Sequence, residues 1–400
     1  MERSCQYPLH QLGQLLRLSG YTLRIMIYLD NAATTKLKKS ALEAMLPVMT
    51  ENFANPSAVY LAAGKARRVM EEARDVLAEG INADRNEIFF TSGGTESDNW
   101  ALLGVAESLR DKGRHVITQK TEHHAVLNAC KNLERRGFEV TYLDVDENGI
   151  LDPKDLEKAV RKDTVLVSVM AANNETGVLQ RIGEIGSITR KKRILFHTDG
   201  VQAFGHIPID VKKMNIDLLS ASAHKIGGPK GVGLLFKDTE AELPPLIFGG
   251  GQERGLRSGT ENVPGIAGFA AAFKDRDDAK RVKELRDFLE TVILKEIKGV
   301  FVNGNTDERL PGILNVSING VKGESVLMRL SSLGICASTG SACTAGSGKP
   351  SHVLKAMGFS NERCNSSLRF SLNGENTKEE MLETVKALKD IVEDFRKILA

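Results

Sequence analysis

Hydrophobic and polar residues alternate along the middle of the chain in a pattern of short apolar runs separated by helical segments. Runs of strand length occur at 86–92, 115–120, 138–145, 164–170, 194–199, 217–224 and 231–236. Helical patterns lie between several of them, at 96–113, 124–137 and 152–160. In the last, Asp152 is the expected N-cap and Pro153 the first helical residue. Strands that alternate with helices predict an α/β fold with a largely parallel sheet covered on both faces.

The pattern changes towards the end of the chain. Helical runs at 279–297, 323–334 and 377–399 alternate with strand runs at 312–318 and 366–372. We therefore expect a smaller α+β domain over 276–400 and a large domain over 26–275, whose opening segment can pack with the small domain. The glycine-rich stretch 248–265 predicts a long loop between them. Residues 1–25 are expected to form an extension outside the fold.

Polar clusters follow the predicted strands of the large domain. In chain order they are SGGTES, TEHH, ANNETG, HTDGVQ and SAHKIGGPKG. Ligands of parallel sheets bind beyond the carboxyl ends of the strands. One such cluster would mean little, but several in consecutive units predict one assembled site.

Composition narrows the class of protein. The chain has 400 residues, 41% of them hydrophobic, and a formal net charge of +2. No apolar run approaches the roughly 18 residues that span a membrane, and no basic patch is interleaved with aromatics, so we expect neither membrane insertion nor nucleic-acid binding. Five scattered cysteines predict neither a disulfide framework nor a zinc site. A reducing, cytoplasmic location is expected.

The first 25 residues hold three arginines and only one acid. A transit peptide is one interpretation, because such segments are rich in arginine and poor in acids. The alternative, which we favour, is that the folded protein begins near Met26.

Individual residues in the clusters have both a chemical and a structural interpretation. Gly93, Gly94 and Thr95 suit a phosphate at a helix N-terminus, but also an ordinary tight turn. Asp199 could pair with a protonated ring nitrogen or simply cap the next helix. Lys225 could be a desolvated Schiff-base lysine or a surface lysine in a glycine loop.

The remaining candidates are two histidines, one cysteine and one arginine. Either His123 or His124 could stack on a flat cofactor and move protons, or be a satisfied loop histidine. Cys343 lies in a loop of small residues, which favours an accessible, reactive thiol over the usual buried one. Arg369 lies within a predicted strand, where its guanidinium needs a structural carboxylate or that of a substrate.

A family resemblance decides between these interpretations. The motifs that carry it, in order, are YLDNAATT, FTSGGTESDN, TEHHAVL, NNETGVLQ, HTDGVQAFG, SASAHKIGGPKG, GGGQERGLRSGT, NVS, STGSACT, PSHVLKAMG and SSLRFSL. Together they resemble the cysteine desulfurases of the NifS and IscS type, in the class V aminotransferase group of pyridoxal-phosphate enzymes. The resemblance covers nearly all of residues 26–399. It implies a PLP-dependent transferase fold of type I.

The resemblance also implies a role for each residue that matches a motif. Lys225 binds pyridoxal 5'-phosphate covalently, Asp199 pairs with the ring nitrogen, and His123 stacks on the ring and moves protons. The residues implied to hold the phosphate are Gly94, Thr95, Ser222, His224 and, from the partner subunit of a homodimer, Thr260. Those implied beside the cofactor's phenolic oxygen are Asn174 and Gln202. Arg369, with Asn174, is implied to bind the substrate carboxylate, and Cys343 to accept the sulfur.

The implied reaction converts L-cysteine to L-alanine and leaves a persulfide on Cys343, which passes to an acceptor such as a scaffold protein of the IscU or NifU kind. Alternatives are a selenocysteine lyase, a related class V aminotransferase, or a non-catalytic sulfur-relay protein. An aminotransferase does not require Cys343, so the presence of this cysteine argues against that alternative. A sulfur relay requires only the cysteine, so the other predicted site residues argue against a non-catalytic relay.

The sequence departs from the family pattern in places. Gly94 stands where many members have alanine, which we expect to be harmless. The segment 338–350 resembles the long loop of the NifS/IscS group, and the chain stops soon after its last helix, which leaves the identity of the acceptor open.

Overall fold

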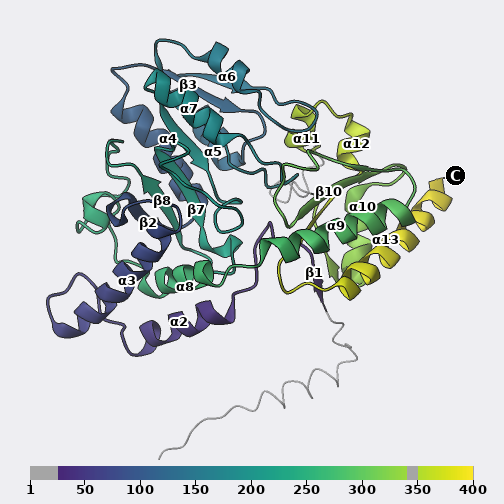
Figure 1. Ribbon diagram of the computed structural model, residues 1–400, viewed down its shortest axis with the longest axis horizontal. Helices are drawn as coiled ribbons and strands as arrows, with labels where there is room; N and C mark the ends of the chain where they lie inside the picture. Colours follow the sequence, from purple (N-terminus) through teal and green to yellow (C-terminus); the bar gives the residue numbers. More distant parts are fainter. Residues whose placement is uncertain (1–25, 340–349, 400) are drawn as a thin grey trace, which may run out of the picture.

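A seven-stranded sheet forms the centre of the larger lobe (Figure 1). The computed structural model describes residues 26–339 and 350–399. In spatial order the strands are β2 (Ile88–Thr91), β8 (Gly233–Lys237), β7 (Leu218–Ser222), β6 (Leu195–Asp199), β5 (Thr164–Ser168), β3 (His115–Gln119) and β4 (Glu139–Leu143). All neighbours are parallel except β8, which runs antiparallel to both β2 and β7. The α/β prediction is therefore confirmed.

Successive side chains of a strand point to opposite faces of the sheet, and here both faces are apolar. Helices therefore cover both faces. In β2, Phe89 packs edge-on against Trp100 at a centroid distance of 5.7 Å, in one apolar cluster, while Phe90 belongs to the cluster on the other face. The helices of this lobe are α2 (Lys39–Thr50), α3 (Leu61–Glu79), α4 (Gly94–Ser108), α5 (His124–Arg135), α6 (Pro153–Ala159), α7 (Ile182–Lys192) and α8 (Val263–Lys274). Asp152 caps α6 as predicted, by accepting the Lys154 N–H at 2.9 Å.

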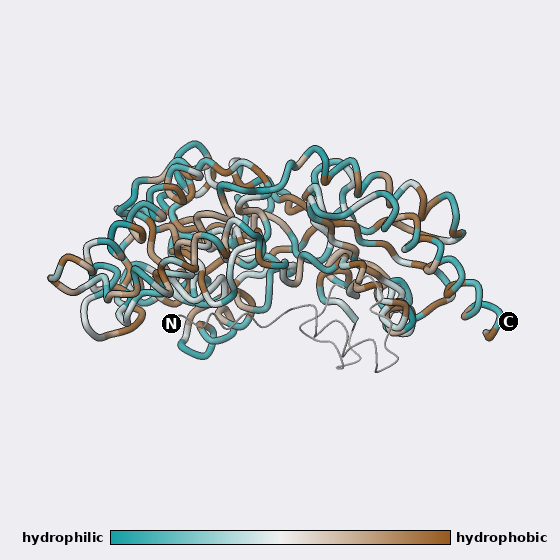
Figure 2. The backbone as a smooth tube through the Cα atoms, turned by 90° about the horizontal axis from the view of Figure 1, so that it is seen from below, coloured by the Kyte–Doolittle hydropathy of each residue, from teal (hydrophilic) through white to brown (hydrophobic). Residues whose placement is uncertain are grey.

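The smaller lobe is built on an antiparallel sheet of β12 (Ser367–Ser371), β10 (Ile313–Ile318) and β9 (Val300–Val302), in that order. Its helices are α9 (Ala279–Glu296), α10 (Gly323–Ser332), α11 (His352–Ala356), α12 (Asn361–Asn365) and α13 (Lys378–Leu399). Hydrophobic stretches run through the inside of both lobes, and the outer helices alternate hydrophobic and hydrophilic turns (Figure 2). No described helix combines the length and apolarity that a membrane span requires.

The opening segment joins the two lobes. Strand β1 (Ile27–Tyr28) pairs in parallel with β11 (Ile335–Cys336), and Ile27 and Leu29 pack in the apolar cluster of the smaller lobe. A few residues later, Thr35 donates its N–H to the carbonyl of His224 at 3.0 Å, in the larger lobe. The domain boundaries themselves stay a prediction.

Candidate active site

A cavity of about 340 Å³ lies where the carboxyl ends of the parallel strands meet residues of the smaller lobe. The predicted site residues that line it are Gly94, Thr95, His123, Asn174, Asp199, Gln202, Ser222, His224, Lys225 and Arg369. Thr260 does not line it and is exposed, and Cys343 lies outside the described residues. The structure thus brings together side chains from six separate sequence segments.

The anion-binding end of the cavity is formed by the start of α4. Gly93, the N-cap, has φ 154° and ψ −179°, a conformation open only to glycine, and Gly94 begins the helix. The first N–H groups of a helix have no acceptor within it and favour an anion. Ser222 and His224 lie opposite, in the same cavity. Burial lowers the pKa of His224 to about 4, so its ring is a neutral hydrogen-bonding group at neutral pH.

Val201 lies against the glycine turn. A Cβ added to Gly94 would lie 2.4 Å from Val201 Cγ2, far inside contact distance. Glycine therefore fits at this position in this chain, whereas alanine would require Val201 to move.

Lys225 ends the short 3-10 turn after β7, η2 (Ala223–Lys225). Its Nζ donates to the carbonyls of Ala32 and Ala33, at 2.7 and 2.9 Å. Gln202 Nε2 donates to the same Ala32 carbonyl at 2.9 Å. The segment that follows β1 therefore holds the lysine and the amide side by side at the cavity floor.

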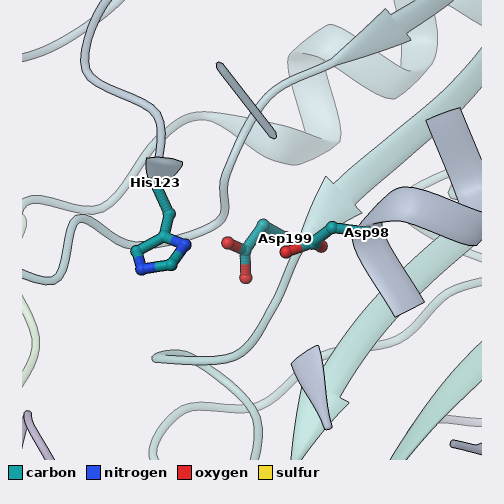
Figure 3. A group of neighbouring side chains, drawn as sticks. All are labelled: Asp98, His123 and Asp199. Carbon is teal, nitrogen blue, oxygen red and sulfur yellow. The ribbon is translucent and has the colours of Figure 1, made fainter. Parts of the chain in front are cut away.

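Three titratable side chains converge beside the lysine. One oxygen each of Asp98 and Asp199 and one ring nitrogen of His123 all lie within 4.8 Å of one another, with the Asp199 carboxylate lying between the other two (Figure 3). Asp199 ends β6 and accepts the Val201 N–H at 2.9 Å. Burial raises the pKa of Asp199, while His123 and Lys225 partly offset that effect. A buried carboxylate of this kind suits a protonated ring nitrogen.

His123 is fixed as the N-cap of α5. The Ala125 N–H donates to its Nδ1 at 3.1 Å, so that nitrogen carries no proton. Burial lowers the pKa of His123 below its ordinary value, although Asp199 opposes the shift. A neutral ring with its proton on Nε2 can lie over a flat cofactor and exchange protons with a bound substrate.

Arg369, in β12, is 2% exposed. Its Nη2 donates to Asp30 at 2.7 Å and its Nη1 to the Asn174 carbonyl at 2.8 Å, while no described residue accepts from Nε. A structural carboxylate therefore orients the guanidinium, and part of its donor capacity remains for a bound anion.

The loop that carries Thr260 is tied down beside α4. Arg257 Nε donates to Glu96 at 2.8 Å, in the first turn of that helix. Glu253 accepts two hydrogen bonds from Arg74, at 2.7 and 2.9 Å, and a third from the Phe90 N–H. Glu253 and Arg254 both have positive φ, 46° and 59°, so the loop conformation is strained and held by these contacts.

Three acidic or histidine residues of the cavity were not identified from the sequence: Asp98, Glu175 and His352. Asp98 lies one helical turn after Gly94, a spacing that could have placed it on the same face. Glu175 accepts the Ser351 hydroxyl at 2.5 Å. His352 donates from Nε2 to the Glu122 carbonyl at 2.9 Å, and its ring lies 4.7 Å from that of His124.

These groups fit pyridoxal phosphate. The cavity offers a helix N-terminus beside a glycine turn for the phosphate, a buried carboxylate for the ring nitrogen and a lysine for the aldehyde. Arg369 Nε has no partner among the described residues, as expected of a donor that a bound anion can satisfy. Fold and site together define an enzyme of the pyridoxal-phosphate class.

Comparison with known proteins identifies the family. The chain belongs to the class-V aminotransferases, because residues 27–383 match the sequence profile "Aminotransferase class-V". It is 49% identical over 375 residues to the "Cysteine desulfurase IscS" of Methanosarcina thermophila, covering 92% of this chain and 93% of the relative. It is 48% identical over 377 residues to the protein of the same name from Dictyoglomus turgidum, covering 93% of this chain and 96% of the relative.

Comparison with solved structures points to the same family. A "NIFS-LIKE PROTEIN" matches with a TM-score of 0.86 and 38% identity, over 92% of this chain and 100% of the other. "SspA in complex with cysteine" matches with a TM-score of 0.80 and 38% identity, over 88% of this chain and 100% of the other. The predicted membership of the NifS/IscS group is thereby confirmed.

Proposed function

We propose that this chain is a cysteine desulfurase, which converts L-cysteine to L-alanine and holds the sulfur as a persulfide on Cys343. Relatives that share nearly half of its residues over almost their whole length carry that name. One observation from the described residues carries the proposal further. Both flanks of the segment 340–349, which contains Cys343, are attached to the walls of the cavity.

On the N-terminal flank, Ser338 and Arg369 exchange two main-chain hydrogen bonds, at 2.6 and 3.1 Å. On the C-terminal flank, the Ser351 hydroxyl donates to Glu175, and His352 lies against His124. A segment that begins and ends at the cavity is suited to bring a thiol to a bound substrate.

Binding of cysteine begins with its carboxylate. Arg369, held by Asp30 and the Asn174 carbonyl, keeps Nε for that anion. When bound, pyridoxal phosphate supplies an electron sink that stabilises negative charge at the substrate α-carbon. Lys225 Nζ takes the α-proton, and His123 Nε2, in the same cavity, exchanges protons with the substrate.

Sulfur transfer falls to Cys343. Its thiolate attacks the sulfur of cysteine, so a sulfur–sulfur bond forms while the bond between that sulfur and the substrate Cβ breaks. The electron pair of the broken bond stays with the substrate carbon, which takes up a proton and leaves as alanine. The persulfide then passes to an acceptor by thiol exchange.

The test is to incubate purified protein with L-cysteine and a thiol reductant, and to measure alanine and sulfide. Cys343→Ser is expected to lose both products because a hydroxyl is a poor nucleophile towards sulfur. Cys336→Ser, at a half-buried free thiol, is the matched control and is expected to keep them. Normal alanine production by Cys343→Ser, or persulfide on another cysteine, would refute the assignment.

Lys225 is tested separately. Lys225→Ala is expected to lose the visible absorption of the bound cofactor together with activity. A variant that kept the absorption would show that another lysine holds the cofactor.

We also propose a homodimer in which Thr260 reaches the partner's phosphate site. In support, Thr260 is exposed and lies outside its own cavity, on a loop anchored by Arg257 beside α4. Large apolar side chains are also exposed along α2, the connection to α3 and the start of α3, namely Leu42, Leu46, Met49, Phe53 and Leu61. An active monomer in sedimentation would overturn this proposal.

We propose a reducing, cytoplasmic setting and an iron–sulfur scaffold protein of the IscU or NifU kind as acceptor. Cys130, Cys336 and Cys364 are free thiols in the described part of the chain, as a reducing compartment favours. Transfer of radiolabelled sulfur from the persulfide to such a scaffold tests the acceptor, and retention of the label on Cys343 would refute it.

A further inference from the structure

Two acidic side chains lie buried together at the foot of the cavity. Asp98 is 1% exposed and Asp199 is 4% exposed. They come from different elements, α4 and the end of β6, and the burial of both is set by helix α4 packing onto the sheet. Their oxygens approach within 4.8 Å (Figure 3).

No strong cation neutralises Asp98. None of the described lysines and arginines forms an ion pair with it, and the one described basic side chain paired with it is His197, whose Nε2 lies 3.6 Å from Oδ1. Burial lowers the pKa of His197 to about 3, so this ring is neutral at physiological pH. Its two nitrogens already bond to Ser168 at 2.8 Å and Ser220 at 3.0 Å.

Asp199 is the better placed of the two to be ionised. It accepts a main-chain N–H from Val201, and both His123 and Lys225 favour its charge. Asp98 Oδ1 accepts no hydrogen bond from any described residue, and the Ser220 hydroxyl, rather than a cation, favours the charge of this carboxylate. Two carboxylates this close in a water-poor site repel each other, and the less supported one keeps its proton.

We propose that Asp98 is a neutral carboxylic acid, so that the Asp98–Asp199 pair presents one negative charge, on Asp199, to the ring nitrogen of the cofactor. Asp98 is a positioning residue in this scheme and acts through Asp199. The effect of this single charge on the cofactor depends on the proposed function, which places the cofactor ring against Asp199. The protonation of Asp98 itself does not depend on that proposal.

The surroundings agree with this assignment. Burial, and next the charge of Asp199, raise the pKa of Asp98 well above its ordinary value, although a hydrogen bond from Ser220 opposes the shift. The titratable groups that face the pair are His123 and Glu122 at the start of α5, His197 on β6 and Lys225 after β7. Burial raises the pKa of Glu122 well above its ordinary value, while the Met170 N–H, which donates to this carboxyl, lowers it.

The first test is infrared spectroscopy of the holoenzyme at pH 8, with and without ¹³C-labelled aspartate. A protonated aspartic acid gives a carbonyl stretch that the label shifts, which separates it from any protonated glutamic acid. We expect one such band, and its loss in Asp98→Asn. Absence of the band from the unsubstituted protein, or its persistence in Asp98→Asn, would overturn the proposal.

The second test is the pH titration of the cofactor's visible absorption. Asp98→Asn exchanges one neutral group for another of the same shape, so we expect the titration midpoint to stay in place. Asp199→Asn removes a charge, and we expect its midpoint to fall by about one pH unit or more. A shift of that size in Asp98→Asn would mean that Asp98 is ionised, and would overturn the proposal.

Asp217→Asn is the matched control, because Asp217 is another buried aspartate, just before strand β7, whose side chain does not line the cavity. It is expected to change neither the band lost in Asp98→Asn nor the midpoint. Neither measurement requires turnover of cysteine. An absence of desulfurase activity would therefore contradict the proposed function without deciding whether Asp98 is protonated.

Discussion

Arg369 and Asp30 form an ion pair 2.7 Å long that fixes the guanidinium at the edge of the cavity. Lysine cannot reproduce this geometry, because a single ammonium group cannot hold Asp30 and the Asn174 carbonyl and also bind a substrate carboxylate in one plane. We expect Arg369→Lys to raise KM for L-cysteine by about 10- to 100-fold, as loss of a charged hydrogen bond of about 1.5–3 kcal/mol implies, with a smaller effect on kcat.

Arg309→Lys is the control for that experiment. Arg309 is also buried and pairs with Glu290 at 2.5 Å, but it does not line the cavity. It is expected to leave KM unchanged. An unaltered KM in Arg369→Lys would remove Arg369 from the substrate site.

Gly94 and Val201 are matched in volume, so their substitutions are expected to be coupled. Gly94→Ala forces its Cβ to within 2.4 Å of Val201 Cγ2, and overpacking of this kind costs about 1–3 kcal/mol. Val201→Ala removes the obstructing methyl group. In a double-mutant cycle monitored by urea unfolding, Gly94→Ala is expected to be destabilising alone and nearly neutral in the Val201→Ala background. Additive effects would show that the two side chains do not compete for space.

The Arg74–Glu253 pair is expected to anchor the loop that carries Thr260. Both side chains are at most 3% exposed. Arg74→Met leaves a buried carboxylate without its cation, which is expected to lower the free energy of unfolding by about 3–5 kcal/mol. Lys389→Met, which breaks the exposed pair with Glu296, is the control and is expected to cost much less. Equal losses in the two variants would contradict the anchoring role.

Asp217 is expected to give the protein a distinct pH dependence. Burial raises the pKa of its carboxyl from 3.8 to about 6 in the folded state. The folded protein therefore binds the proton more tightly than the unfolded chain, and this contribution to stability is present below pH 4 and is lost as pH rises through 6. Asp217→Asn lacks this loss, so its stability relative to the unsubstituted protein is expected to increase by about 2–3 kcal/mol between pH 4 and pH 7. Chemical unfolding at both pH values measures the difference, and a constant difference would show an unshifted pKa.

Most of the sheet could be predicted because its strands are short apolar runs bounded by turn residues, and both faces of them are buried. The antiparallel direction of β8 could not, because an apolar run has no direction of its own. Helix α8 was not recognised either, since it packs against both α2 and α3 and is apolar nearly all round. Helix α2 exposes Leu42 and Leu46, which blurs its amphipathic pattern.

Some residues of the site could likewise be predicted from the sequence, and others could not. Lys225, Asp199 and His123 stand at strand ends, where parallel-sheet geometry brings polar residues together, and motif resemblance singles them out. Asp98 has the sequence environment of a surface acid in a helix, and only the packing of α4 on the sheet buries it. Asp30 as the partner of Arg369 joins residues at opposite ends of the chain, a contact that no local pattern encodes.

The segment from Ile27 to Lys38 has a consequence for how the protein unfolds. It contributes a strand and two core side chains to the smaller lobe, and its carbonyls and hydroxyls then bond to Lys225, Gln202 and Gly227 in the larger lobe. Neither lobe can lose its packing without breaking the hydrogen bonds of this shared strand with the other. The two lobes are therefore thermodynamically coupled, and calorimetry is expected to record one cooperative transition, with lysine, strand and both cores melting together.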